Sequence, residues 1–139
     1  MKVVVDTNVM LVSINPASRF NPVFRQAISG QYNLCISNAI LLEYEEIFKW
    51  RINFKMAESA LAAFINSPFV FRQDPHISWR LISTDPDDDK FSDCAIAAGA
   101  HYLVTNDRHF DVLKQTPFPK LNVISAEAFL EILTSKTDG

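Results

Sequence analysis

Carboxylate side chains occur in this chain at the places where chain geometry gathers side chains. Asp6 closes the apolar run VVVDTN, Glu43 lies in ISNAILLEYEE, several acids crowd DPDDDKFSD, and Asp107 follows the apolar run in LVTND. Acids placed repeatedly at the ends of apolar strands, and on the helices beside them, indicate a site for hard divalent cations. Such a site usually serves phosphate chemistry.

The elements that must position these acids follow from the apolar pattern. Apolar segments rich in β-forming residues alternate with longer segments of helical period, which is typical of a parallel sheet flanked by helices. The expected strands are 2–6, 32–36, 69–72, 102–105 and 121–124. The expected helices are 21–29, one that starts at a Ser37 or Asn38 cap, about 55–66, one opened by DPDDD, about 108–115, and a last one capped by Ser125. The uninterrupted apolar strands fit burial on both faces.

This arrangement would bring the acids together. In an open α/β sheet, ligands bind at the carboxyl ends of the strands, where neighbouring strands connect in opposite directions. Asp6 ends the first strand and Asp107 lies just beyond another. The helices that carry Glu43 and DPDDD start on the same side. Oxygen ligands without His or Cys at metal spacing favour Mg²⁺ or Mn²⁺, and either one or two ions would suffice.

Each acid also has a purely structural interpretation. Asp6 and Asp107 could form a turn or cap a helix, and Glu43 could be a solvated helix acid. At least one acid of DPDDD must be only a helix cap. Each of the four, taken alone, is therefore a weak candidate for a metal ligand: Asp85, Asp87, Asp88 and Asp89. Asp93 lies four residues after Asp89, on nearly the same helix face, as a ligand or as a surface residue.

Length and composition indicate one domain over residues 1–139. The chain is 48% hydrophobic and 21% charged, with a net charge of −3. The apolar run at the N-terminus is broken by Asp6, too early for a signal peptide or a membrane span, so we expect a cytoplasmic protein without a membrane partner. Cys35 and Cys94 stand in apolar segments without CxxC spacing, which favours buried thiols.

The net negative charge does not exclude a nucleic-acid partner, because the acids assigned to the site account for it. Basic residues between positions 19 and 80 interleave with Phe and Trp, a mixture compatible with contacts to the backbone and bases of single strands. Arg51 and Lys55 are the candidates for substrate binding. Solvated bases above an aromatic core are the simpler interpretation of any single residue.

The segments VVVDTNVMLVS, SNAILLEYEEIF and DPDDDKFSDCAIAAGAHYLVTNDRHF, with the spacing between them, resemble the PIN domain. The likeness covers about residues 2–133 and is specific to the bacterial branch of toxin components of toxin–antitoxin systems. It implies a three-layer α/β/α sandwich, PIN-like and Rossmann-like, with a mostly parallel central sheet. It also implies an endoribonuclease dependent on Mg²⁺ or Mn²⁺, in which metal-activated water attacks an RNA phosphodiester and leaves 5′-phosphate and 3′-hydroxyl ends.

The resemblance also assigns roles to residues. Carried over position by position, the catalytic and metal-binding acids are Asp6, Glu43, an acid of DDDKF, and Asp107. The third acid is Asp88 when Ala95 and Gly99 are aligned, and Asp89 when positions are counted back from Asp107. Asp93 is an auxiliary metal ligand. Thr7, Asn8, Thr105 and Asn106 match polar positions beside the acids and are expected to orient them by hydrogen bonds.

The expected partners are an RNA substrate, a cognate antitoxin and a second copy of the chain in a homodimer. One alternative is a PIN-like scaffold that binds RNA or protein without significant nuclease activity. An aspartyl phosphatase would need a second Asp at position 8, where this chain has Asn8. His109, two residues past Asp107, could touch substrate, although surface placement is the simpler interpretation.

Overall fold

The computed structural model describes residues 1–82 and 85–138. Its centre is a sheet of five parallel strands in the order β3-β2-β1-β4-β5. The strands are β1 (Lys2–Val5), β2 (Asn33–Ile36), β3 (Phe71–Arg72), β4 (Tyr102–Val104) and β5 (Val123–Ile124). Val3, Val4 and Val5 are fully buried in the central strand. The apolar run at the N-terminus therefore forms the middle of the sheet, as its composition predicts.

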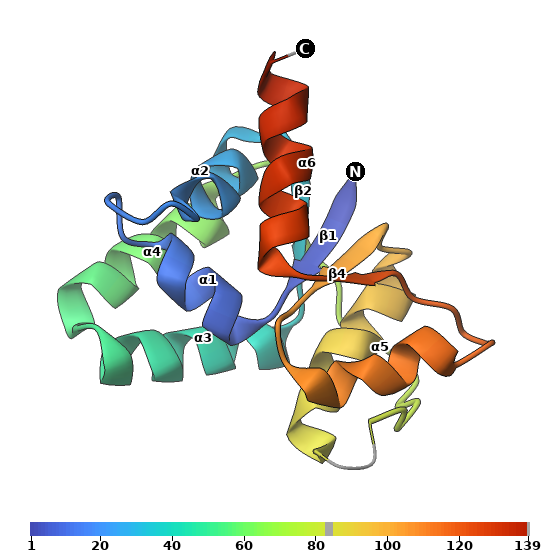
Figure 1. Ribbon diagram of the computed structural model, residues 1–139. Coiled ribbons are helices and arrows are strands. Elements are labelled where there is room, and N and C mark those ends of the chain that lie inside the picture. The colour runs from blue at the N-terminus through green and yellow to red at the C-terminus, as the bar shows by residue number, and fades with distance from the viewer. Residues whose placement is uncertain (83–84, 139) are drawn as a thin grey trace.

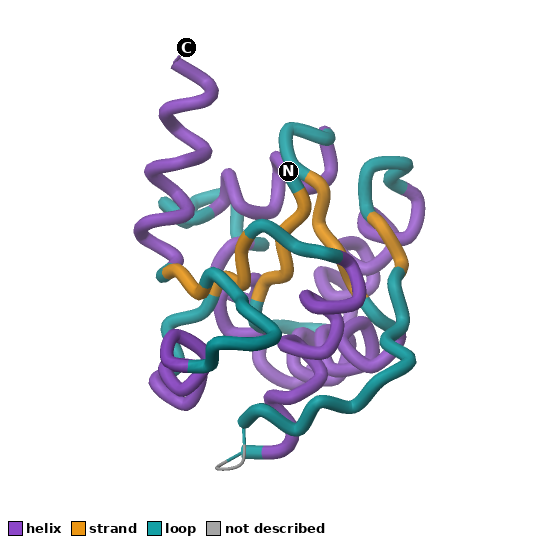
Figure 2. Tube along the Cα trace, turned by 90° about the vertical axis from the view of Figure 1, so that its right-hand side faces the viewer, coloured by secondary structure: helices purple, strands orange, loops and turns teal. Residues whose placement is uncertain are grey.

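Helices cover both faces of this sheet. They are α1 (Thr7–Ser13), α2 (Asn21–Ser29), α3 (Asn38–Arg51), α4 (Phe54–Asn66), α5 (Asp89–Ala98) and α6 (Ala126–Asp138), with two 3₁₀ helices, η1 (Pro86–Asp88) and η2 (Arg108–Gln115). Helix α5 packs on β1, β2 and β4, while α1 to α4 lie on the other side of the sheet (Figure 1). Figure 2 shows the strands side by side between the helices. This is the predicted α/β/α sandwich with a parallel sheet.

Local sequence signals set the ends of several helices. Ser37 caps α3 by accepting a hydrogen bond from the Ile40 amide at 3.2 Å, which settles the choice between Ser37 and Asn38. Asn53 caps α4 in the same way. Helix α2 begins at Asn21 and ends before Gly30, whose φ of 85° is a left-handed conformation that glycine adopts without a steric penalty.

All five strands and the expected helices are confirmed, with shorter strands at several ends. The prediction missed α1, the seven-residue helix that follows Asp6 directly. Asp6 stands at its N-cap position but makes no side-chain cap hydrogen bond, and the helix is short. Both cysteines are buried free thiols, as expected. No helix in the described ranges is long and apolar enough to cross a membrane.

Candidate active site

The strand order places Asp6 and Asp107 beside the point where the sheet connections reverse direction. From β1 the chain proceeds to β2 and β3 on one side, and β4 and β5 lie on the other. Asp6 follows β1 directly, and its backbone amide donates to the Val104 carbonyl at 2.9 Å. Asp107 follows β4, the neighbour of β1. The crevice between two such strands is where open α/β sheets bind ligands.

The Thr105 hydroxyl links these two acids. It donates a hydrogen bond to Asp6 Oδ2 at 2.8 Å and accepts one from the Asp107 backbone amide at 3.0 Å. Thr105 and Asp6 are both buried, with 4% and 6% of their surface exposed. The hydroxyl thus holds one carboxylate and the loop that carries the other in a fixed relation.

Replacing Thr105 with Val should lower the free energy of unfolding by about 1–3 kcal/mol, because the Asp6 carboxylate and the Asp107 amide each lose a buried partner. Thr105→Ser keeps the hydroxyl and is the matched control. Urea titrations of both variants measure the difference. A Val variant as stable as the Ser variant would show that the bridging hydroxyl contributes nothing.

Glu43 reaches the same site from α3. The Thr7 hydroxyl donates to Glu43 Oε2, and Lys90 Nζ donates to Glu43 Oε1 at 2.8 Å. The Tyr44 hydroxyl, fully buried, donates to the Val5 carbonyl and fixes α3 against the end of β1. The Thr7 contact agrees with the expected orienting role, whereas the sequence reasoning overlooked Lys90. Its position directly after DDD was the available signal.

The side chains of Asp88, Asp89 and Asp93 have different contacts. Asp89 Oδ1 accepts a hydrogen bond from the Ile82 amide at 2.8 Å, and Asp93 Oδ1 accepts one from the Trp79 amide at 3.0 Å. Both carboxylates therefore anchor the loop that precedes η1. Asp88, at the end of η1, instead lies near the His109 ring, whose Nδ1 is 3.6 Å from Asp88 Oδ2 and 3.4 Å from Asp107 Oδ1. Of the two candidates for the third acid, Asp88 is the one that faces the strand-end acids.

Burial, and after it the repulsion of neighbouring carboxylates, raises the pKa of two acids of the cluster, Asp6 and Asp88. Burial is the largest cause of the raised pKa of Asp6; Thr105 opposes it, while Glu43 and Asp107 add to it. The pKa of Asp88 is raised to about 6, first by burial and then by Asp85, Asp107 and Asp6, with His109 opposing. Carboxylates arranged in this way are destabilised as anions unless a cation compensates them.

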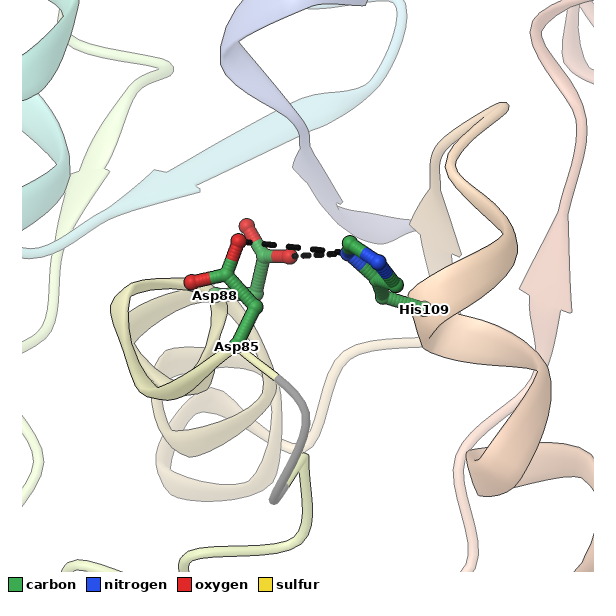
Figure 3. A group of neighbouring side chains, drawn as sticks. All are labelled: Asp85, Asp88 and His109. Atoms are coloured by element: carbon green, nitrogen blue, oxygen red, sulfur yellow. Dashed lines mark ion pairs between the residues drawn. The ribbon is translucent and has the colours of Figure 1, made fainter.

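Asp85 and His109 join the cluster (Figure 3). The sequence analysis names Asp85 among the candidate acids of DPDDD, but it assigns neither residue as a ligand. His109 Nδ1 lies 3.4 Å from Asp107 Oδ1, 3.6 Å from Asp88 Oδ2 and 3.9 Å from Asp85 Oδ2. One ligand atom each from Asp85, Asp88 and His109 fall within 4.8 Å of one another. His109 is half exposed, as expected, but its ring faces three carboxylates. Its place two residues after Asp107 was the only signal.

An open cleft of about 380 Å³ leads to Asp6 and Asp107. Asn8 and Asn106 line it together with apolar residues of α1 and with Phe20. Asn106 Oδ1 also accepts a hydrogen bond from the Ala126 amide at 3.0 Å, so this side chain holds the start of α6 beside the acids. The cleft gives an extended ligand access to both carboxylates.

Arg51 and Lys55 lie away from the acids. Both are exposed, Arg51 at the end of α3 and Lys55 in the first turn of α4. Arg51 is about two helical turns beyond Glu43, or roughly 12 Å along the axis. The Arg51 guanidinium lies 5.5 Å from the centre of the Trp50 ring, and Trp50 is 75% exposed. These bases could contact only a ligand that extends well beyond the acid cluster.

Comparison with solved structures supports this architecture. VapBC2 from Rickettsia felis, solved with a DNA fragment from its promoter, is similar over 90% of this chain and 98% of that chain, with a TM-score of 0.61 and 20% identity. DNA-bound VapBC from Salmonella typhimurium has a TM-score of 0.60 and 19% identity, over 91% of this chain and 98% of that chain. VapC20 from Mycobacterium tuberculosis, a toxin that cleaves the sarcin-ricin loop, has a TM-score of 0.55 and 18% identity, over 81% of this chain and 94% of that chain. At these identities the likeness shows a shared fold.

Sequence comparison gives the family. A search of curated proteins found no match. The family model for the PIN domain matches residues 2–109, which span β1 to the start of η2 and include every acid of the cluster. This match takes in well over half of the chain, and the chain therefore belongs to the PIN-domain family.

Proposed function

We propose that this PIN-domain protein is a divalent-cation-dependent endoribonuclease and acts as the toxin of a toxin–antitoxin pair. One observation carries the proposal: four acids meet at the crevice between β1 and β4. Asp6 and the Asp107 loop share the Thr105 hydroxyl, Asp107 and Asp88 share the His109 ring, and Glu43 accepts a hydrogen bond from Thr7, the residue after Asp6. Lys90 and His109 are the basic residues in contact with these acids among the described interactions.

The residues present fit a divalent ion. The donors are mainly carboxylate oxygens, which suit Mg²⁺ and Mn²⁺. Asp88 Oδ2 is completely buried, and no hydrogen bond reaches it from the described part of the chain. A buried carboxylate oxygen left in this state costs free energy that an ion would offset. When bound, the ion would polarise the phosphodiester and lower the pKa of a water molecule.

The protein's own residues then have distinct tasks. The ion would be held by Asp6, Asp88, Asp107 and Glu43. Asp89 and Asp93 would be auxiliary acids, because each already uses one carboxylate oxygen to accept a hydrogen bond from a loop amide. Thr105 and Thr7 orient Asp6 and Glu43. The cleft lined by Asn8 and Asn106 would admit the strand to be cut. No side-chain nucleophile is required for hydrolysis by water.

Metal dependence tests the proposal directly. Purified protein should cut single-stranded or loop RNA internally with Mg²⁺ or Mn²⁺ and should stop when a chelator removes the ion. The products should carry 5′-phosphate and 3′-hydroxyl ends, which end-labelling distinguishes. Cleavage that survives the chelator would contradict the mechanism. RNA binding without any cleavage would instead favour the scaffold alternative.

Arg51 and Lys55 would bind the RNA backbone at a distance from the cut. The double variant Arg51→Ala, Lys55→Ala should weaken RNA binding and reduce the slope of log K against log salt concentration by about 1.4, because each lost contact to a single strand accounts for about 0.7. Filter binding from 50 to 300 mM salt, roughly the range used for such slopes, measures this effect. The double variant Lys114→Ala, Lys120→Ala is the control. Equal slopes for the test variant and wild type would remove Arg51 and Lys55 from the RNA site.

The partners proposed are an antitoxin and a second copy of the chain. The two similar VapBC structures were each solved as VapBC bound to DNA. In this chain, Leu42, Trp50 and Phe54 on α3 and α4 are 66%, 75% and 66% exposed, whereas Phe64 is buried. Large exposed apolar side chains mark a protein-binding surface where they form one contiguous patch. Light scattering of the isolated protein, and rescue of growth by a neighbouring small gene, test the two partners separately.

A further inference from the structure

His109 occupies a fixed position at the acid cluster. Asp107 Oδ1 accepts a hydrogen bond from the His109 backbone amide at 2.9 Å, so the first turn of η2 holds the histidine beside this acid. From there the ring extends toward η1, where Asp85 stands just before the first residue and Asp88 is the last (Figure 3). The ring thus joins two elements that the sequence separates by about twenty residues.

The spacing of these atoms suits ligands of one ion. Two ligand atoms at about 2.1–2.3 Å from an ion, with angles of about 90–110° between them, lie roughly 3.0–3.8 Å apart. The 3.6 Å between His109 Nδ1 and Asp88 Oδ2 falls within this range, and the 3.9 Å between His109 Nδ1 and Asp85 Oδ2 lies just beyond it. Asp88 Oδ2 is the buried oxygen that accepts no hydrogen bond among the described residues. An ion at this point would contact both that oxygen and the imidazole nitrogen.

We propose that His109 Nδ1, together with Asp85 and Asp88, forms a nitrogen-containing end of the cation site that favours first-row transition-metal ions over Mg²⁺. The proposal rests on the proposed function, because it concerns the same acidic cluster. An imidazole nitrogen is a good ligand for first-row transition metals, whereas Mg²⁺ prefers oxygen alone. The histidine would therefore raise the affinity of the site for transition-metal ions relative to its affinity for Mg²⁺.

The competing explanation is electrostatic. A protonated His109 would neutralise part of the charge of Asp85, Asp88 and Asp107 without ever contacting an ion. The two explanations differ in one observable, a bond between nitrogen and the metal. A paramagnetic probe ion reports that bond directly, and the result does not depend on RNA cleavage.

The experiment uses Mn²⁺ as the probe. Electron spin-echo spectra of the Mn²⁺-loaded protein should show modulation from a directly bound ¹⁴N nucleus, and His109→Gln should abolish it. His76→Gln, which changes an exposed histidine outside the cluster, should retain it. By titration, His109→Gln should weaken Mn²⁺ binding about 10-fold or more and Mg²⁺ binding less than about 3-fold. Asp85→Asn should weaken Mn²⁺ binding yet keep the nitrogen signal.

The outcomes separate this inference from the proposed function. Bound Mn²⁺ without nitrogen modulation would overturn the role of His109 and leave the carboxylate site intact. Equal losses of Mn²⁺ and Mg²⁺ affinity in His109→Gln would overturn the selectivity. Failure of wild type to bind either ion would overturn both proposals together.

Discussion

Asp6→Asn should lower the rate of RNA cleavage by about a thousandfold or more. Asp6 is the most buried acid of the cluster and contacts Thr105 at the end of the central strand. Loss of its charge would remove a ligand from an ion whose stabilisation of the reaction amounts to several kcal/mol, and about 4 kcal/mol corresponds to three powers of ten. Initial rates with saturating Mg²⁺ or Mn²⁺ measure the change. Asp111→Asn is the matched control, since Asp111 is exposed and pairs only with Lys114 among the described contacts.

The Asp6→Asn variant should remain folded, so unfolding would not explain its loss of cleavage activity. The side-chain amide oxygen introduced by Asp6→Asn can accept the same Thr105 hydrogen bond, and the neutral amide no longer repels Glu43 and Asp107. The melting temperature without metal should therefore stay equal or rise. Calorimetric titration should show weaker Mn²⁺ binding in the same sample. A variant that keeps a tenth of wild-type activity would contradict a central role for Asp6.

The sequence predicts the architecture well because burial leaves a strong pattern. Continuous apolar runs such as the one ending at Val5 occur where both faces of a strand are covered. Helix caps at Ser37 and Asn53 depend on side chains that local sequence displays. Helix α1 begins after Asp6 without a side-chain cap hydrogen bond and has only seven residues, so its formation depends on packing against α2 and α3. That packing is tertiary information.

The site was predictable only in part, for a related reason. Asp6 and Asp107 follow strands, and a parallel sheet brings the ends of neighbouring strands together. For Asp88 and Asp89 the direction depends on where a 3₁₀ turn becomes an α-helix, because adjacent residues there point about 100° or more apart. His109 and Lys90 meet the acids through side-chain directions in three dimensions. No periodicity in the sequence specifies those contacts.

Asp88→Asn should stabilise the metal-free protein at neutral pH. In the folded protein the pKa of Asp88 is raised to about 6 from 3.8, because the carboxyl is buried near Asp85, Asp107 and Asp6. At about pH 3 and below the carboxyl is mainly protonated in both states, so it has little effect on stability. As pH rises to about 6, only the unfolded chain loses the proton, and the folded state is progressively destabilised. Above that range the penalty is constant, up to about 3 kcal/mol.

The side-chain amide in the Asp88→Asn variant carries no charge, so the variant avoids this penalty. In chelator, the difference in the free energy of unfolding between Asp88→Asn and wild type should be small at pH 4 and grow until about pH 7. Urea titrations across that range measure it. Mn²⁺ should reverse the order, because the ion stabilises wild type through the same carboxylate that destabilises it alone. A difference independent of pH and of Mn²⁺ would mean that Asp88 neither bears this electrostatic strain nor binds the ion.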